Sequence, residues 1–347
     1  IRFKTEMVIN VHGYIREFRF LSNDRSVLMF NKSSLITLFF CTFALSKALL
    51  ALVRVAKKRT IYNRMTTISN QHFEGERPLF ESHGLRLEHV TIGDGESAVK
   101  ECSDIEAEDC RFWGKYPFWH VDGLTIRRCQ FDAGARSALW YSNRLLMADT
   151  RIDGPKMFRE MHQLKLENVV INDADETFWR CTDIEAHNLE LHDGTYPFMF
   201  CDRVKIDGLK SDSKYVFQYC KNVELNNAHI VTKDSFWECE NVTISNSILD
   251  GEYLAWHSKH VRLVNCHLAG EQLLCYAHHL ELENCTFDKA CDRVFEYSEV
   301  VADIRGHIEN IKNPTSGYIV ADSIGSLTID ENIRQPADCK IVTRNGK

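Results

Sequence analysis

Residues 223–246 read VELNNAHIVTKDSFWECENVTISN and contain two copies of the motif that runs through most of the chain. Each copy is an aliphatic-x-aliphatic pair with Asn at the fourth position after the pair begins. Eleven pairs recur every 19 to 21 positions, beginning at Leu85, Ile105, Leu124, Leu145, Leu164, Ile184, Val204, Val223, Val242, Val261 and Leu280. Self-similarity at a fixed period of this length indicates a solenoid, in which each repeat forms one coil and stacks on its neighbours.

Each repeat has two short apolar stretches separated by polar bends, and neither stretch is long enough for a helix. The first strand is the aliphatic pair. An Asn column follows it, made of Asn168, Asn188, Asn227, Asn246, Asn265 and Asn284. Asn tolerates left-handed backbone at a bend, and its amide can bond to the Asn one coil away, about 4.8 Å off. The sequence predicts an all-β, right-handed parallel β-helix of about eleven or more coils of 19–21 residues.

A leucine-rich repeat has a similar period and is the alternative fold. Its Asn follows two residues after the last leucine, whereas here one residue intervenes, as in Leu225-Asn226-Asn227. Its convex side also needs helix or turn sequence, where this chain has Phe-Trp-x-Cys. These two differences favour the β-helix.

The repeat divides the chain into a single β-helix domain over residues 65–347 and an extension over 1–64 that lacks the motif. The extension carries 12 Lys and Arg against 3 Asp and Glu. Of the chain's 42 basic and 49 acidic residues, 30 and 46 remain for 65–347, a net charge of −16. Because binding to phosphate backbones needs Lys and Arg, we expect no nucleic acid partner.

The extension contains an apolar stretch, 35–53, which is followed closely by Arg54, Lys57, Lys58 and Arg59. Three interpretations stay open: a membrane anchor, an upstream segment with Met65 as the true start, and packed structure. We expect a membrane association only if the apolar stretch belongs to the protein. The sequence leaves the oligomeric state open.

Nine of the thirteen cysteines fall into two columns of the repeat. Five precede the aliphatic pair by three residues, and four follow its start by five: Cys102, Cys181, Cys201, Cys220 and Cys239, then Cys110, Cys129, Cys266 and Cys285. A residue repeated at one place in successive coils is a small apolar filler of a stacked interior. We therefore predict free, buried thiols and, because reduced thiols are typical of that compartment, a cytoplasmic location.

The coils with Phe-Trp-x-Cys are entered by Gln71-His-Phe-Glu-Gly-Glu-Arg-Pro-Leu-Phe80. With this entry segment, residues 65–347 resemble an uncharacterised bacterial family of single-domain β-helix proteins in the pectin-lyase-like superfamily. The resemblance implies the fold and no established activity. A solenoid also needs protected ends, and we expect caps near 71–80 and over 301–347, where the repeat loses register.

The second strand of each repeat carries the aromatic residues. If its side chains alternate strictly, the Trp positions face the interior and the Phe positions face outward with charged neighbours. That assignment predicts an exposed aromatic stripe, larger than a soluble monomer usually shows without a function. The predicted ligand-binding residues are Tyr116, Phe118, His120, Tyr141, Phe198, Phe200, Tyr219 and His257. The alternative is that Phe and Trp both pack inside, because a kinked strand breaks the alternation.

Aromatic side chains stack on the apolar faces of sugar rings, so we expect an oligosaccharide or glycoconjugate ligand along this stripe. A polysaccharide-lyase-like enzyme and a structural or protein-interaction solenoid are the alternatives. The candidate catalytic residues are Glu160 with Arg180 and Glu238 with His257, each pair in neighbouring coils. Opposite charges one coil apart are also ordinary cross-strand pairs. We expect no cofactor and no metal centre, although calcium at the Asp-rich bends remains an alternative.

Overall fold

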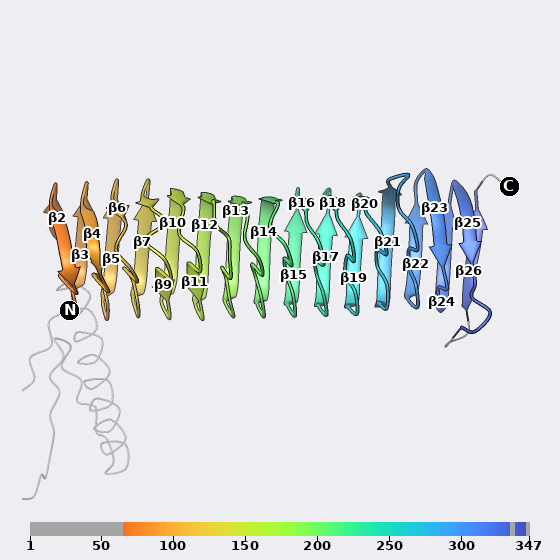
Figure 1. Cartoon of the computed structure of the whole chain (residues 1–347), viewed down its shortest axis with the longest axis horizontal. Helices are drawn as coiled ribbons and strands as arrows, with labels where there is room; N and C mark the ends of the chain where they lie inside the picture. Colours follow the sequence, from red (N-terminus) through yellow and green to blue (C-terminus); the bar gives the residue numbers. More distant parts are fainter. Residues whose placement is uncertain (1–64, 334–336, 345–347) are drawn as a thin grey trace, which may run out of the picture. The chain divides into compact units, whose positions relative to one another are not determined.

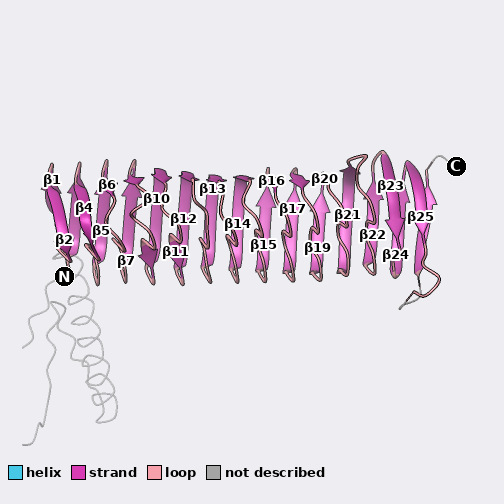
Figure 2. Ribbon diagram, viewed as in Figure 1, coloured by secondary structure: helices cyan, strands magenta, loops and turns pink. Residues whose placement is uncertain are grey.

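The computed structural model describes residues 65–333 and 337–344. These residues form a parallel β-solenoid of about 14 turns, whose coils stack along one axis (Figure 1). Every regular element in this part of the chain is a strand, and none is a helix (Figure 2). The predicted all-β parallel solenoid is thus confirmed. The extension 1–64, with the apolar stretch 35–53, lies outside the described residues.

One 22-stranded parallel sheet runs through the solenoid. Its longer series holds the aliphatic pairs and their equivalents at the two ends: β1 (Thr66–Ser69), β3 (His83–Glu88), β5 (Ser103–Glu108), β7 (Asp122–Arg127), β10 (Asn143–Ile152), β12 (His162–Ile171), β13 (Thr182–Leu191), β14 (Asp202–Ser211), β15 (Lys221–Asn226), β17 (Glu240–Ser245), β19 (Lys259–Val264), β21 (His278–Phe287), β22 (Glu299–Ile304), β24 (Ser316–Ala321) and β26 (Asp338–Thr343). A second series follows the Asn corner: β2 (His72–Glu76), β4 (Thr91–Glu96), β6 (Arg111–Phe112), β8 (Gln130–Phe131), β16 (His229–Val231), β18 (Ile248–Asp250) and β20 (His267–Ala269).

Two small sheets complete the coils. β9 (Leu139–Trp140) pairs with β11 (Phe158–Arg159), and β23 (His307–Lys312) pairs with β25 (Ser323–Thr328). At the N-terminal end β2, within the expected cap 71–80, pairs with β4. At the C-terminal end β22, β24 and β26 continue the main sheet, so the described residues after 301 still contribute stacked strands. No described residue belongs to a helix long and apolar enough to cross a membrane.

The aliphatic pairs stack in register. Leu164 is the Cα partner of Ile184, which in turn is the partner of Val204. These side chains are buried, while the residue between the two members of each pair points outward, as a pleated strand requires. The interior is therefore a continuous column of aliphatic side chains, and each coil buries its apolar surface against the next.

The Asn column forms the predicted ladder at the corner. The Asn188 amide donates to the Asn168 side-chain carbonyl at 3.0 Å, and Asn284 donates to Asn265 at 2.7 Å. The backbone of all these residues is left-handed, with φ near 53° at Asn168, Asn265 and Asn284. Asn is suited to this corner because it tolerates that conformation and satisfies its amide on the neighbouring coil.

The Phe residues of the second strand form a stack inside the solenoid, contrary to the predicted outward placement. Phe178, Phe198 and Phe217 are fully buried, and successive ring centroids are 4.5 Å apart. Phe118 is fully buried as well. The prediction that Phe118 and Phe198 lie on an exposed face is therefore wrong.

The cause lies in the backbone of this segment. Left-handed residues interrupt the strand in each coil, as at Tyr196, Phe198 and Phe200, with φ of 58°, 60° and 59°, and at Tyr116 and His120 on either side of Phe118. A chain of this conformation turns continuously and does not pleat, so side chains do not alternate between two faces. In the coil before Leu124, Pro117 and Phe118 are both buried, whereas Trp119 is half-buried and His120 is exposed.

All cysteines in the described residues are free, and all but Cys339 are buried, as predicted. The thiols of Cys201 and Cys220 donate to the carbonyls of Phe178 and Phe198 at 2.7 and 2.6 Å. Burial raises the pKa of the Cys181 thiol to about 12 and that of Cys220 well above its ordinary value. These thiols fill the interior beneath the aromatic turn. The cytoplasmic location stays a prediction.

Candidate functional site

The turn that contains the Phe stack presents outward the residue two positions after the stacked one and, in most coils, the residue between them as well. We call the resulting surface the outer aromatic face. Its members are half-buried or exposed and come from successive coils: Trp119, His120, Trp140, Tyr141, Arg159, Glu160, Trp179, Arg180, Phe200, Tyr219, Trp237, Glu238, Trp256, His257, Tyr276 and Tyr297. Because each coil repeats the same turn, their side chains stack about 4.8 Å apart along the solenoid axis.

Several rings of the outer aromatic face are stacked on the ring of the next coil. The centroids of His120 and Tyr141 are 5.1 Å apart, as are those of Phe200 and Tyr219. Near the C-terminal end, His257 stacks on Tyr276 at 4.8 Å. Stacking in this range is favourable and holds each ring flat against its neighbour.

Three Trp residues of this face are fixed by hydrogen bonds to the following coil. The indole N–H groups of Trp119, Trp140 and Trp256 each donate to a backbone carbonyl at 2.6 Å. A half-buried Trp with its N–H satisfied keeps an apolar ring at the surface in one orientation. These three rings are therefore positioned before any ligand arrives.

Two arginines lie among these rings. The Arg159 guanidinium is 4.3 Å from the Trp140 ring centroid and 5.2 Å from that of Trp179, and it also pairs with Glu176 at 2.9 Å. Arg180 lies over the Phe200 ring at 5.3 Å. Within the described part of the chain, Arg180 has no carboxylate within 4.0 Å, so its charge is not neutralised by an ion pair.

Five predicted ligand residues belong to this face: Tyr141 is half-buried, and His120, Phe200, Tyr219 and His257 are exposed. Tyr116 is half-buried and lies beside the face, with its ring centroid 5.0 Å from that of Trp119. Phe118 and Phe198 are brought into the interior. The Trp residues, which strict alternation assigned to the core, lie at the surface. The sequence does carry a sign that these Trp residues lie at the surface, because each is followed directly by a polar or charged residue.

The four candidate catalytic residues are exposed on the outer aromatic face. No ion pair joins Glu160 to Arg180, or Glu238 to His257, in the residues that the structure describes. Arg180 packs on Phe200, and the ring of His257 lies 6.0 Å from that of Trp237. Arg180 and His257 thus have ring contacts, and neither forms an ion pair with its candidate partner.

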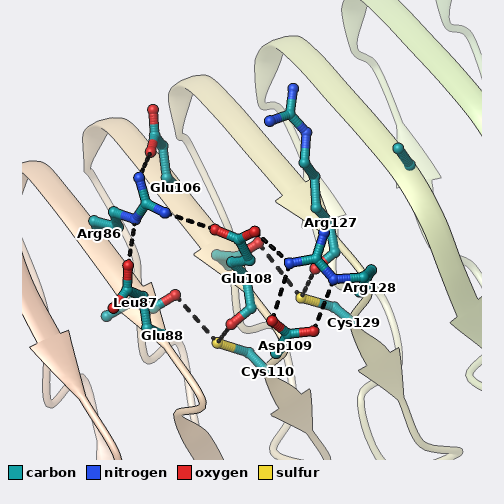
Figure 3. Close-up of polar contacts among 12 residues, drawn as sticks. Arg86, Leu87, Glu88, Glu106, Glu108, Asp109, Cys110, Arg127, Arg128 and Cys129 are labelled. Carbon is teal, nitrogen blue, oxygen red and sulfur yellow. Dashed lines mark hydrogen bonds and ion pairs between the residues drawn. The ribbon is translucent and has the colours of Figure 1, made fainter.

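A separate charged surface lies on the outward side of the aliphatic strands. At its N-terminal end Arg86 contacts Glu88 and Glu108 at 2.7 Å and Glu106 at 3.5 Å (Figure 3). Arg128 pairs with Glu108 and, at 2.9 Å, with Asp109. Hydrogen bonds from Arg128 hold the pKa values of Glu108 and Asp109 below their usual range. Glu88, Glu106, Glu108 and Asp109 are thus paired with Arg86 or Arg128.

Some Asp side chains at the bends form contacts with other residues of the chain. Asp153 accepts a hydrogen bond from Gln130 at 2.6 Å and pairs with Arg151 at 3.3 Å. Asp175 accepts a hydrogen bond from the Thr195 hydroxyl at 2.8 Å. Among residues 65–333 and 337–344, no group of three or more His, Cys, Asp or Glu side chains is arranged to hold a metal ion.

Two solved structures are similar in fold. The catalytic domain of the GH87 α-1,3-glucanase in complex with nigerose has 11% identity and a TM-score of 0.27, with 81% of this chain and 64% of that chain covered. A mutant of the periplasmic alginate epimerase AlgG has 9% identity and a TM-score of 0.23, with 80% and 74% covered. The chain spans 64% of the glucanase domain, less than two thirds of its length.

No curated protein matches the chain. A family match covers residues 66–342, which is almost all of the solenoid described above. The chain therefore belongs to the family described as Protein of unknown function (DUF3737).

Proposed function

We propose that this protein binds a glycan along the outer aromatic face. The observation that carries the proposal is the row of outward rings on successive coils, each fixed by stacking or by an indole hydrogen bond. An extended polymer of rings is the ligand whose shape matches a linear, repeating aromatic surface. Rings with a fixed orientation also lose little conformational entropy on binding.

The polar groups on the same surface supply the directional contacts. Arg180, beside Phe200, has donors available for hydroxyl or carboxylate oxygens. The hydroxyl of Tyr219 and the ring of His257 can donate or accept. An apolar platform with a few polar groups is the usual composition of a ligand site, although this one is an open surface.

Binding is a better account of this surface than glycoside hydrolysis. Hydrolysis by the common mechanisms needs two carboxyl groups about 5 to 9.5 Å apart. Glu160 and Glu238 stand four coils apart, which is about 19 Å at the usual strand spacing. The lyase-like alternative needs a base beside a carboxylate-neutralising group, and the observation specific to the candidate Arg180 is its contact with the Phe200 ring.

The test compares Phe200→Ala with Tyr318→Ala. Both rings are 39% exposed, and each has a cation above it, Arg180 at 5.3 Å and Lys340 at 5.7 Å. Tyr318 lies on β24, outside the outer aromatic face. The two variants thus remove similar exposed rings from different places.

Neutral and acidic oligosaccharides would be titrated into the full chain by calorimetry. We expect one class to bind and Phe200→Ala to weaken that binding about tenfold, which is about 1.4 kcal/mol. Tyr318→Ala should bind as the parent does. Equal losses in the two variants, or no binding by any oligosaccharide, would refute the proposal. Self-association that only Phe200→Ala abolishes would instead favour a protein-interaction surface.

A further inference from the structure

The Asn ladder has a break in the coil of β14. Asn188 donates to Asn168 at 3.0 Å, but the next position of the column is Gly208, whose φ is 78°. Asn227 follows in the coil after that and donates to Asp207 at 2.8 Å. One rung is therefore missing between Asn188 and Asn227.

The break leaves an acceptor without a donor. In an unbroken part of the ladder, the side-chain carbonyl of Asn265 accepts a hydrogen bond from Asn284 at 2.7 Å. The Asn188 side-chain carbonyl accepts none from the described residues. It leans over Gly208, where an added Cβ would lie 2.9 Å away. The Asn188 carbonyl that accepts no hydrogen bond thus lies next to the position where Gly208 lacks a side chain.

A groove of about 430 Å³ lies at this place. Asn188, Gly208 and Asn227 line it from the corner column, and Glu190, Lys210 and His229 line it from the outward position two residues later. The groove crosses the coils of β12 to β16, about 14 Å along the axis at the usual strand spacing. It is formed on the strands after the aliphatic pair and not on the outer aromatic face.

The charges in the groove are balanced within the protein. The Lys210 ammonium pairs with Glu190 at 2.8 Å, and this hydrogen bond holds the pKa of Glu190 below its usual range. Glu190 also lies 3.5 Å from His192. The groove consequently offers amide donors and acceptors and carries no uncompensated cation for an anionic ligand.

We propose that this groove binds a neutral saccharide, with one sugar hydroxyl taking the place of the missing Asn rung. A hydroxyl can donate to the Asn188 carbonyl and at the same time accept from a neighbouring amide. Such a ligand completes the ladder without bringing a charge beside the Lys210 and Glu190 pair. This site is independent of the proposed function of the outer aromatic face.

The decisive variant is Gly208→Asn. Asn at this corner keeps left-handed backbone in six other coils, and the atom nearest to its Cβ is the end of the flexible Asn188 side chain. The new amide should complete the ladder and fill the groove. Gly84→Asn is the matched control, because Gly84 is also left-handed, with φ of 62°, and an added Cβ there meets nothing within 4 Å.

Maltotriose, cellotriose and mannotriose would be titrated into the full chain, with trigalacturonate as the anionic comparison. We expect a neutral trimer to bind more tightly than trigalacturonate. Gly208→Asn should weaken its binding at least tenfold without lowering the melting temperature, and Gly84→Asn should bind as the parent does. Asn188→Ala, which removes the acceptor and leaves the groove open, should also weaken binding tenfold, and it decides the question if Gly208→Asn does not fold.

The same titration in Phe200→Ala distinguishes this site from the outer aromatic face, since binding in the groove should not change there. The inference is overturned by the absence of binding of any neutral trimer, by retention of binding in a folded Gly208→Asn or Asn188→Ala variant, or by tighter binding of trigalacturonate.

Discussion

Phe198 and Phe200 lie two residues apart in one turn, both with left-handed backbone, yet Phe198 is fully buried and Phe200 is 39% exposed. The ring of Phe198 stacks between those of Phe178 and Phe217 at 4.5 Å, whereas Phe200 stacks on Tyr219 at the surface. One turn therefore supplies both a core ring and a surface ring, and their removal should have different effects.

Phe198→Ala should lower the free energy of unfolding by about 3 to 5 kcal/mol, because it leaves a cavity in a packed stack. Phe200→Ala should cost about 1 kcal/mol or less, as expected for a half-exposed side chain. Urea unfolding followed by circular dichroism measures both. Equal costs in the two variants would contradict the placement of Phe198 in the core.

Substitutions of Asn265 separate the hydrogen bonds of the corner Asn from its tolerance of left-handed backbone. Asn265 donates to Asn246 at 3.1 Å and accepts from Asn284 at 2.7 Å. Asn265→Gly keeps the left-handed backbone and loses both bonds, so we expect a loss of about 1 kcal/mol. Asn265→Ala should cost about 1 kcal/mol more, because alanine disfavours this conformation. Thermal unfolding of the pair checks the order, and equal stabilities would mean that conformation contributes little at this corner.

Asp183 should contribute to the loss of stability in acid. Its hydrogen bond from Arg203 at 2.6 Å lowers the pKa of this carboxyl to about 2. In the unfolded chain the pKa of an Asp is about 3.9. The stabilisation from the ionised Asp183 is therefore complete above about pH 4 and is lost as the pH falls towards 2. Arg203→Gln should raise the pKa of Asp183, as followed by NMR titration of its carboxyl carbon. An unchanged pKa would show that Arg203 does not determine it.

The buried thiols should resist alkylation in the folded protein. Burial raises the pKa of Cys220, and the reactive form is the thiolate. We expect iodoacetamide at pH 8 to label Cys220 only after unfolding in guanidinium, with mass spectrometry as the readout. The half-buried Cys339 is the internal comparison and should be labelled earlier. Labelling of Cys220 before Cys339 would contradict the stacked interior.

The sequence predicted the parts of the fold that depend on repetition. The pairs beginning at Leu164, Ile184 and Val204 are apolar at fixed spacing, so their register and burial followed from the pattern. The Asn ladder followed from the same spacing. The placement of Phe198 did not, because apolar periodicity carries no signal for backbone that is left-handed at every second residue. The sequence does mark the place of the groove, because Gly208 occupies the position that Asn188 and Asn227 occupy in their coils.

The left-handed positions of the turn also restrict which side chains can occupy them. Among the described residues, the non-glycine positions with positive φ include His120, Glu160, Arg180, Phe200 and Tyr219, but no Val, Ile, Thr or Pro. Branching at Cβ and the proline ring are the features that this conformation excludes, while charge, polarity and aromaticity are unrestricted. Single substitutions can therefore set the order of cationic, anionic and aromatic groups along the axis, one group about every 4.8 Å, on an unchanged backbone.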